Sequence, residues 1–182
     1  MNNLQLCPPD RRPGNVSAGI RINNMKKKYI LTDETIEHLG HTLHRIKAVK
    51  DFATISAGTL GGYVESETNL DHTGDAWVYE NARVSENAKV SGDAKVSGAA
   101  WVTGDAVVTG DADFAVISGF GRVFRTTTFF RCKDNLVRCQ CGCFYGTVDE
   151  FRSKVRETHG NSKYAKEYLM IADLMELHFK ED

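Results

Sequence analysis

Four cysteines gathered in one short stretch are the residues of this sequence best suited to chemistry. Cys139, Cys141 and Cys143 alternate in the segment CQCGCF, and Cys132 lies just upstream. Alternate residues of an extended strand face the same side, so the first three would lie together. Cys132 would join them if a tight turn with two central residues precedes the strand. A three-residue loop would place Cys132 on the opposite side.

Crowded thiols with a histidine nearby are typical of a structural zinc site, because Zn²⁺ takes about four soft nitrogen or sulfur ligands in a tetrahedron. His159 follows Cys143 by sixteen residues and shares a helix face with Phe151 and Val155, which should turn inward. We therefore expect a closed, structural zinc site that joins a hairpin to a helix. The candidate ligands are Cys141, Cys143 and His159, with Cys139 or Cys132 as the fourth.

Two other interpretations of the thiols stay open. Reduced cysteines can pack as small hydrophobic side chains, and one of them could be a catalytic thiol. The catalytic interpretation is the weaker of the two, since no single cysteine stands apart beside an evident base. We expect no catalytic residue here.

The elements around the cysteines can be placed from local signals. The segment before and after KDN is rich in Thr, Phe and Val and predicts a β-hairpin. Thr147 and Glu150 form a capping box that begins a helix, and Gly160 ends it. A second helix is expected over residues 162–179, with an apolar stripe at helical spacing. We expect the two helices to cap the open end of the preceding domain.

That preceding domain is a repeat of six residues, which is the strongest pattern in the chain. Alanine recurs at positions 76, 82, 88, 94, 100, 106 and 112, and valine follows two positions later at 78, 84, 90, 96, 102 and 108, with Phe114 in the seventh unit. One large and one small apolar position every six residues suit a triangular solenoid of very short strands, in which three units make one coil.

The repeat resembles that of hexapeptide-repeat left-handed β-helices, in which a small residue follows an aliphatic one by four positions. The expected fold is therefore mainly β: a short left-handed β-helix with a C-terminal β-hairpin and a two-helix cap. Another β-solenoid or a flat repeat sheet is the structural alternative. The expected divisions are a flexible tail over residues 1–25, entering strands over 26–74, the repeats over 75–122, and the hairpin and helices over 123–182.

Stacking of units three apart predicts what faces outward. Trp77 would lie above Lys95, and Arg83 would stack with Trp101. Exposed aromatic side chains are favoured at protein interfaces. The predicted partner-binding residues are Trp77, Tyr79, Trp101, Arg83 and Lys95. The alternative is that flanking segments cover the aromatic rings.

Composition sets further bounds. The 182 residues carry a formal net charge of −1 and are 41% hydrophobic, so the chain can bury a core. A near-neutral balance gives no reason to expect direct binding of nucleic acid or of an anionic membrane. No apolar run is long enough to span a bilayer, and no secretory signal is evident, so we expect a cytoplasmic protein.

The histidines outside the cysteine region give weaker signals. His38, His41 and His44 recur every three residues, but Gly40 between them argues against a helix, so we expect solvated side chains. His72 precedes the repeats, and acyltransferases built on the same repeat use a histidine as general base. An acyltransferase-like enzyme is therefore an alternative function, although these repeats run without an inserted loop.

Three segments together resemble a family of small prophage-encoded hexapeptide-repeat proteins. They are the sequence of residues 58–84, the repeat itself, and the CGCFYGT and ETHG motifs within residues 141–160. The resemblance implies a phage origin and the cytoplasm of a bacterial host, and it implies no activity. We therefore expect a non-enzymatic inhibitor that binds a host protein, such as a CRISPR nuclease (an anti-CRISPR protein), with no small-molecule substrate. A virion or assembly component is the third possibility.

Overall fold

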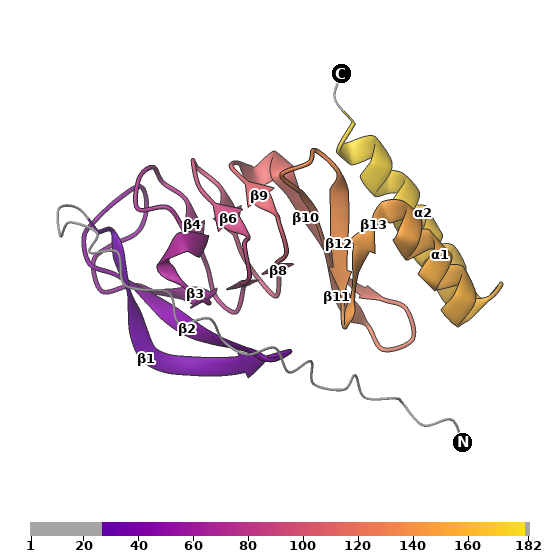
Figure 1. Cartoon of the computed structure of the whole chain (residues 1–182), viewed down its shortest axis with the longest axis horizontal. Coiled ribbons are helices and arrows are strands. Elements are labelled where there is room, and N and C mark those ends of the chain that lie inside the picture. Colours follow the sequence, from indigo (N-terminus) through magenta and orange to yellow (C-terminus); the bar gives the residue numbers. More distant parts are fainter. Residues whose placement is uncertain (1–26, 181–182) are drawn as a thin grey trace.

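The structure is a computed structural model that describes residues 27–180 (Figure 1). The predicted flexible tail, residues 1–25, lies outside the described residues. From one end of the long axis to the other lie an N-terminal hairpin with the first coil, the six-residue repeats, a four-stranded sheet, and two helices. The described part of the chain is thus mainly β, with helices at the C-terminal end.

The repeats form six strands of two residues each. They are β4 (Trp77–Val78), β5 (Arg83–Val84), β6 (Lys89–Val90), β7 (Lys95–Val96), β8 (Trp101–Val102) and β9 (Val107–Val108). Strand β4 pairs in parallel with β7, β5 with β8, and β6 with β9. Units three apart in the sequence therefore share a face, as the repeat predicts. The predicted neighbours Trp77 and Lys95, and Arg83 and Trp101, lie in register.

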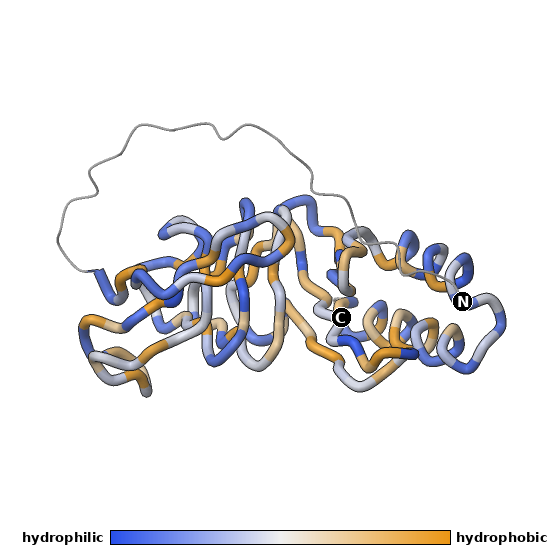
Figure 2. The backbone as a smooth tube through the Cα atoms, turned by 90° about the horizontal axis from the view of Figure 1, so that it is seen from below, coloured by the Kyte–Doolittle hydropathy of each residue, from blue (hydrophilic) through white to orange (hydrophobic). Residues whose placement is uncertain are grey.

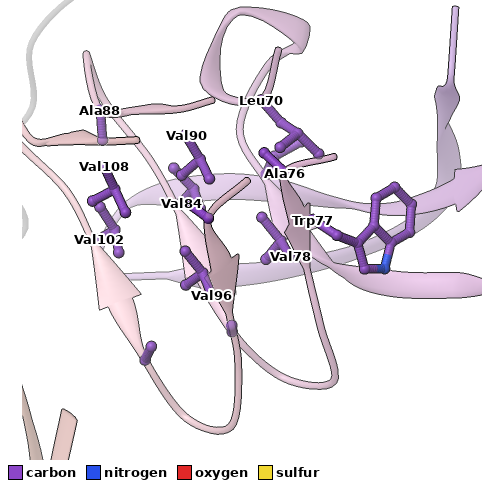
Figure 3. Packing of buried hydrophobic residues seen from close by; sticks show 14 of the residues in the cluster. Leu70, Ala76, Trp77, Val78, Val84, Ala88, Val90, Val96, Val102 and Val108 are labelled. Carbon is purple, nitrogen blue, oxygen red and sulfur yellow. The ribbon is translucent and has the colours of Figure 1, made fainter. Parts of the chain in front are cut away.

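The inside of the coils is a continuous apolar core (Figure 3). The second residue of every short strand is a valine whose side chain is buried, and the alanines of the repeat from Ala76 to Ala106 are buried too. The valines of successive coils stack on one another because parallel pairing repeats the same side chain on each face. The alternation of a large and a small side chain suits the close packing of this narrow interior.

The segment before the repeats adds a partial coil and a long hairpin. Strand β3 (Leu60–Val64) pairs in parallel with β5, and Leu70 bridges Val90, so residues 60–70 continue two faces of the solenoid. Strands β1 (Tyr29–His38) and β2 (His41–Ala48) form an antiparallel hairpin attached to β3. In Figure 1 this hairpin runs along the side of the coils toward β8.

A four-stranded antiparallel sheet closes the other end of the solenoid. It is made of β10 (Phe114–Phe120), β11 (Arg125–Arg131), β12 (Val137–Cys141) and β13 (Phe144–Thr147), in that order. The sheet attaches to the last coil through backbone contacts, including a bridge between Cys132 and Ala106. It begins at Phe114, after the short 3₁₀ turn Asp111–Asp113, so its first strand lies inside the segment 75–122 that the repeat pattern assigns to the solenoid.

The two helices are α1 (Val148–His159) and α2 (Lys163–His178). The predicted capping box is confirmed: the backbone N–H of Glu150 donates to Thr147 Oγ1 at 3.3 Å, and the backbone N–H of Thr147 donates to Glu150 Oε2 at 2.8 Å. Gly160 ends α1 with a φ of +55°. Among the described residues no helix is both long and apolar enough to cross a membrane.

The helices do not cover the solenoid directly. The sheet lies between them, and its two faces pack in different cores: Phe130 faces the solenoid, whereas Phe129 faces α1 and α2. The expectation that the helices cap the open end is therefore replaced by a three-layer order of solenoid, sheet and helices. The reason is that the hairpin predicted around KDN is part of a wider sheet, which offers one face to each neighbour.

Candidate functional site

The loop between β11 and β12 decides where Cys132 lies. Arg131 pairs with Val137, and the backbone N–H of Cys132 donates to the carbonyl oxygen of Leu136 at 2.9 Å. Three residues therefore form the loop, and Asn135 adopts a left-handed φ of 63°. Cys132 consequently faces the solenoid core, on the opposite side of the sheet from Cys139 and Cys141.

Strand β12 carries Cys139 and Cys141 on the face that packs on the helices. Cys139 is fully buried there, beside Phe129 across the β11–β12 pair. Cys141 is half-buried and accepts a hydrogen bond from Thr127 Oγ1 at 3.1 Å. Cys143 lies in the turn after the strand and is exposed.

Three of the five predicted zinc ligands do share one place. Cys141, Cys143 and His159 line the same cavity between the sheet and α1. The His159 ring stacks on the Tyr168 ring with 5.8 Å between the ring centroids, so its position is set by both helices. Sequence spacing therefore found the right neighbourhood for these three side chains.

The tetrahedral set itself is not assembled in the structure. Within residues 27–180, no group of three or more His, Cys, Asp or Glu side chains is placed to hold a metal ion. Cys132 cannot contribute, because the sheet separates it from the cavity. The structural zinc stays a prediction, and of the two candidates for the fourth ligand only Cys139 lies on the correct face.

Burial makes the inner thiols poor nucleophiles. Burial raises the pKa of both the Cys139 and the Cys132 thiol above the ordinary value for cysteine. A thiol with a raised pKa carries little thiolate near neutral pH, and thiolate is the reactive form. Cys132 and Cys139 pack in the cores on the two sides of the sheet, which is what the packing alternative to a zinc site expects.

Parts of the predicted partner-binding surface are covered by other segments. The clearest difference from the prediction is the position of Trp77. Its side chain is fully buried. The ring of Phe52 meets the indole edge-on with 5.4 Å between centroids, and Tyr29 meets it at 6.3 Å. The N-terminal segment folds back over this face of the solenoid, so the prediction that Trp77 binds a partner is wrong.

The remaining residues of that surface are placed differently from one another. Trp101 is half-buried: its ring meets the His38 ring at 4.4 Å, and its Nε1–H donates to Ser85 Oγ at 3.0 Å. Tyr79 and Arg83 are half-buried, whereas Lys95 is exposed. Their role in binding a partner stays a prediction, but they no longer form a continuous aromatic patch.

His72 lies in the packed junction before the repeats. Its ring stacks on Tyr29 with 4.3 Å between centroids, and its Nδ1 faces the backbone N–H of Lys28 at 3.4 Å. Burial lowers the pKa of His72 below its ordinary value. Its position reflects packing against Tyr29.

Sequence reasoning missed an exposed apolar stripe on α2. Met170, Leu174 and Leu177 have 71%, 55% and 70% of their side-chain surface exposed. They lie on the side of the helix opposite the buried residues Tyr168 and Ala172. The signal was present in the sequence, because α2 carries more apolar residues than one buried face requires. We call these three residues the α2 stripe.

Comparisons with known proteins add no family. No model of a known protein family matches the chain, and no curated protein is similar enough to count as a relative.

Proposed function

We propose that this chain is a non-enzymatic binding protein that docks on another protein through the α2 stripe. The observation that supports the proposal is the contrast between the two sides of α2. One side is buried on the sheet and α1, while the other presents three large apolar side chains to solvent. Exposed apolar clusters of this kind mark interaction surfaces.

The geometry of the stripe suits docking into a groove. Met170, Leu174 and Leu177 are spaced four and three residues apart, so they form a row along one line of the helix. The row is ~10 Å long at 1.5 Å per residue. An amphipathic helix that places such a row in an apolar groove is a common mode of protein recognition.

Contacts with α1 and the sheet hold α2, which carries the stripe, in place. Arg152 of α1 donates from Nη2 to Asp173 at 2.8 Å and to Glu176 at 2.7 Å, which ties α2 to α1 beside the stripe. Ala172 and Met175 are buried on the opposite side. Figure 2 shows the alternation of hydrophobic and hydrophilic segments along both helices. A surface that is already ordered loses little conformational entropy on binding.

Charge at the N-terminal end of the stripe indicates the chemistry of the partner. Lys166 and Lys163 are exposed one and two turns before Met170, and Lys163 also pairs with Glu167 at 3.4 Å. The partner we propose is a folded protein with an apolar groove bordered at one end by carboxylates. The resemblance to prophage-encoded proteins suggests a bacterial host protein, such as a CRISPR nuclease, which the chain would inhibit.

The repeats are part of the same proposal. Their period and small–large alternation favour a left-handed coil, in which the short stack acts as a rigid body that carries the sheet and helices. The solenoid would then hold the α2 stripe at a defined distance from the N-terminal hairpin, which offers a second contact near Trp101 and Lys95.

The test combines capture with a measured affinity. Full-length protein captures partners from a bacterial lysate, and each captured protein is then purified and its Kd determined with the wild type. The triple variant Met170→Ser, Leu174→Ser, Leu177→Ser should bind at least about tenfold more weakly, because it removes the apolar contact and leaves the buried face of α2 unchanged. If the partner is a nuclease, the wild type should inhibit DNA cleavage and the triple variant should not.

A matched control separates the stripe from general surface hydrophobicity. Leu60 and Leu136 are 49% and 50% exposed and lie on the N-terminal strands and the β11–β12 loop. The double variant Leu60→Ser, Leu136→Ser should bind like the wild type. Equal affinity of the triple variant contradicts the proposal. So does a wild-type dimer in sedimentation that the triple variant converts to a monomer, since the stripe would then contact a second copy.

A further inference from the structure

The cavity that collects Cys141, Cys143 and His159 has properties that the zinc prediction does not explain. Its volume is about 390 Å³, which lies within the range of small-molecule sites. It opens between the β10–β11 loop, the β12–β13 turn and α1. The lining residues are Arg122, Val123, Arg125, Cys141, Cys143, Phe144, Phe151, Lys154, Val155, Thr158, His159 and Tyr168. We call it the cationic cavity.

The charge of the lining has one sign. Arg122, Arg125 and Lys154 contribute three cations, and no carboxylate of residues 27–180 lines the cavity. Lys154 also pairs with Glu157 at 3.0 Å, on the exposed side of α1. Neither arginine has a carboxylate partner in the part of the chain that the structure describes. A concave site lined by charges of one sign attracts ligands of the opposite sign.

The glycine of the CGC motif makes room for one of these cations. Gly142 has a φ of +63°, and a Cβ at this position would collide with Nη1 of Arg125. The turn between Cys141 and Cys143 therefore lies directly against the guanidinium group. Only glycine combines the left-handed backbone with this close approach. The spacing of the motif is thus explained by the position of Arg125 as well as by the thiols.

The wall of the cavity is aromatic. The ring of Phe151 lies 5.8 Å from that of Phe144 and 5.7 Å from that of Tyr168, measured between centroids. Such a wall offers dispersion contacts to a planar apolar group and adds no negative charge.

We propose that the cationic cavity binds a small organic anion, with its carboxylate or phosphate group held by Arg122 and Arg125 and its apolar body on the aromatic wall. A guanidinium group donates two parallel hydrogen bonds to either kind of oxyanion, and is more weakly hydrated than an ammonium group. The three cations disfavour Zn²⁺ in the same place, because they repel a divalent cation.

Isothermal titration calorimetry of the full chain tests the proposal with three naphthalene probes. 1-Naphthyl phosphate and 1-naphthoate carry the two candidate anionic groups, and 1-naphthalenemethanol is neutral. We expect both anions to bind at least about tenfold more tightly than the alcohol, and their ratio identifies the preferred headgroup. The double variant Arg122→Gln, Arg125→Gln should lose at least about tenfold in affinity for the anions.

The control keeps the number of removed charges the same. Arg156 and Lys89 are exposed and lie outside the cavity lining. The double variant Arg156→Gln, Lys89→Gln should bind the anions like the wild type. Circular dichroism and thermal unfolding establish that both variants fold. Equal loss in the two variants would show a general charge effect and would overturn the proposal.

A second readout places the ligand. Cys143 is exposed and lines the cavity, so a bound anion should slow alkylation of Cys143 by iodoacetamide, measured by peptide mass spectrometry. Unchanged alkylation at saturating 1-naphthyl phosphate overturns the proposed position. Tight binding of the neutral alcohol overturns the role of the arginines, and one equivalent of retained zinc overturns the choice of an anion.

Discussion

Nζ of Lys28 lies 2.7 Å from the carbonyl oxygen of Ala76, at the point where the chain enters the repeats. The same ammonium group donates to the carbonyl oxygens of Thr73 and Gly74 at 3.4 and 3.3 Å, and it lies over the ring of Phe52. The side chain is fully buried. Lys28 thus donates to three backbone carbonyls at the start of the first coil.

Removing the Lys28 amine should change how stability depends on pH. Burial lowers its pKa from the ordinary 10.5 to about 8. Below about pH 8 the group is protonated in both states, and the folded state bears the full cost of burying the charge. Between about pH 8 and 10.5 mainly the unfolded chain keeps the proton, so the contribution of Lys28 to the free energy of unfolding rises with pH.

Urea unfolding of the wild type and Lys28→Met at pH 7.5 and pH 10 measures this effect. We expect the difference in free energy of unfolding between the two proteins to shift in favour of the wild type at the higher pH. Burial raises the pKa of Tyr29, so this residue lowers the free energy of unfolding above pH 10. The effect is common to the wild type and the variant, so it cancels in the comparison. A difference that does not vary with pH would contradict the buried amine, as would a Lys28 Cε NMR signal that titrates at the ordinary pKa.

Gly61 should tolerate no side chain. A Cβ at this position would lie 2.6 Å from Cγ1 of Ile46 and 2.7 Å from Cζ2 of Trp77. We expect Gly61→Ala to lower the free energy of unfolding by about 1–3 kcal/mol, because the added methyl group must displace both side chains. Urea unfolding of the purified protein gives the value.

Gly110 provides the matched control for that substitution. A Cβ there would meet only Asp93 Oδ1, at 3.4 Å, and its φ of −151° is accessible to alanine. Gly110→Ala should change the free energy of unfolding by no more than about 0.5 kcal/mol. Similar losses for the two glycines would mean that backbone freedom, and not the contact with Trp77, explains the result.

Trp77 itself should contribute to stability and not to partner binding. Trp77→Ala removes a fully buried indole and should lower the free energy of unfolding by about 3–5 kcal/mol. Trp77→Phe should cost less than about 1.5 kcal/mol, since the indole Nε1–H has no hydrogen-bond partner among the described residues and need not be replaced. Loss of partner affinity in a folded Trp77→Phe variant would return Trp77 to the binding surface.

The contrast between Trp77 and the repeat shows what a single sequence can predict. The stacking of Arg83 on Trp101 follows from local periodicity, because any unit is paired with the unit three places on. The covering of Trp77 depends on Phe52 and Tyr29, which come from a segment with no repeat. Contacts between segments without a shared pattern leave no periodic signal, so the sequence gives burial of the indole only as an alternative to its exposure.

The cysteine region shows the same limit at shorter range. Alternation in CQCGCF correctly predicts that Cys139 and Cys141 share a face. The side on which Cys132 lies depends on whether the β11–β12 loop has two or three residues. The three-residue loop requires the left-handed conformation of Asn135. Asparagine adopts this conformation more easily than most residues, but the segment KDN is compatible with either turn. Arg122 and Arg125 lie close together in the sequence, but Lys154 comes from α1, so the three cations of the cavity gave no local motif.

Metal analysis of the purified protein separates the two occupants proposed for the cavity. The zinc prediction requires about one zinc per chain, lost in Cys143→Ser and in His159→Ala. It also requires that Cys132→Ala keep the metal, because the sheet places Cys132 in the solenoid core. We expect instead a protein without tightly held zinc, since the lining contains Arg122, Arg125 and Lys154, which repel a divalent cation.

Mass spectrometry under native conditions and elemental analysis, both on protein expressed with added zinc, make the measurement. The control is Lys89→Gln, which leaves the cavity unchanged and should give the wild-type metal content. One zinc per chain that is lost in Cys143→Ser would contradict the anion site and support the predicted structural zinc site. Zinc that is lost in Cys132→Ala but kept in Cys143→Ser would contradict both, because the metal would then lie on the face of the sheet that packs on the last coil.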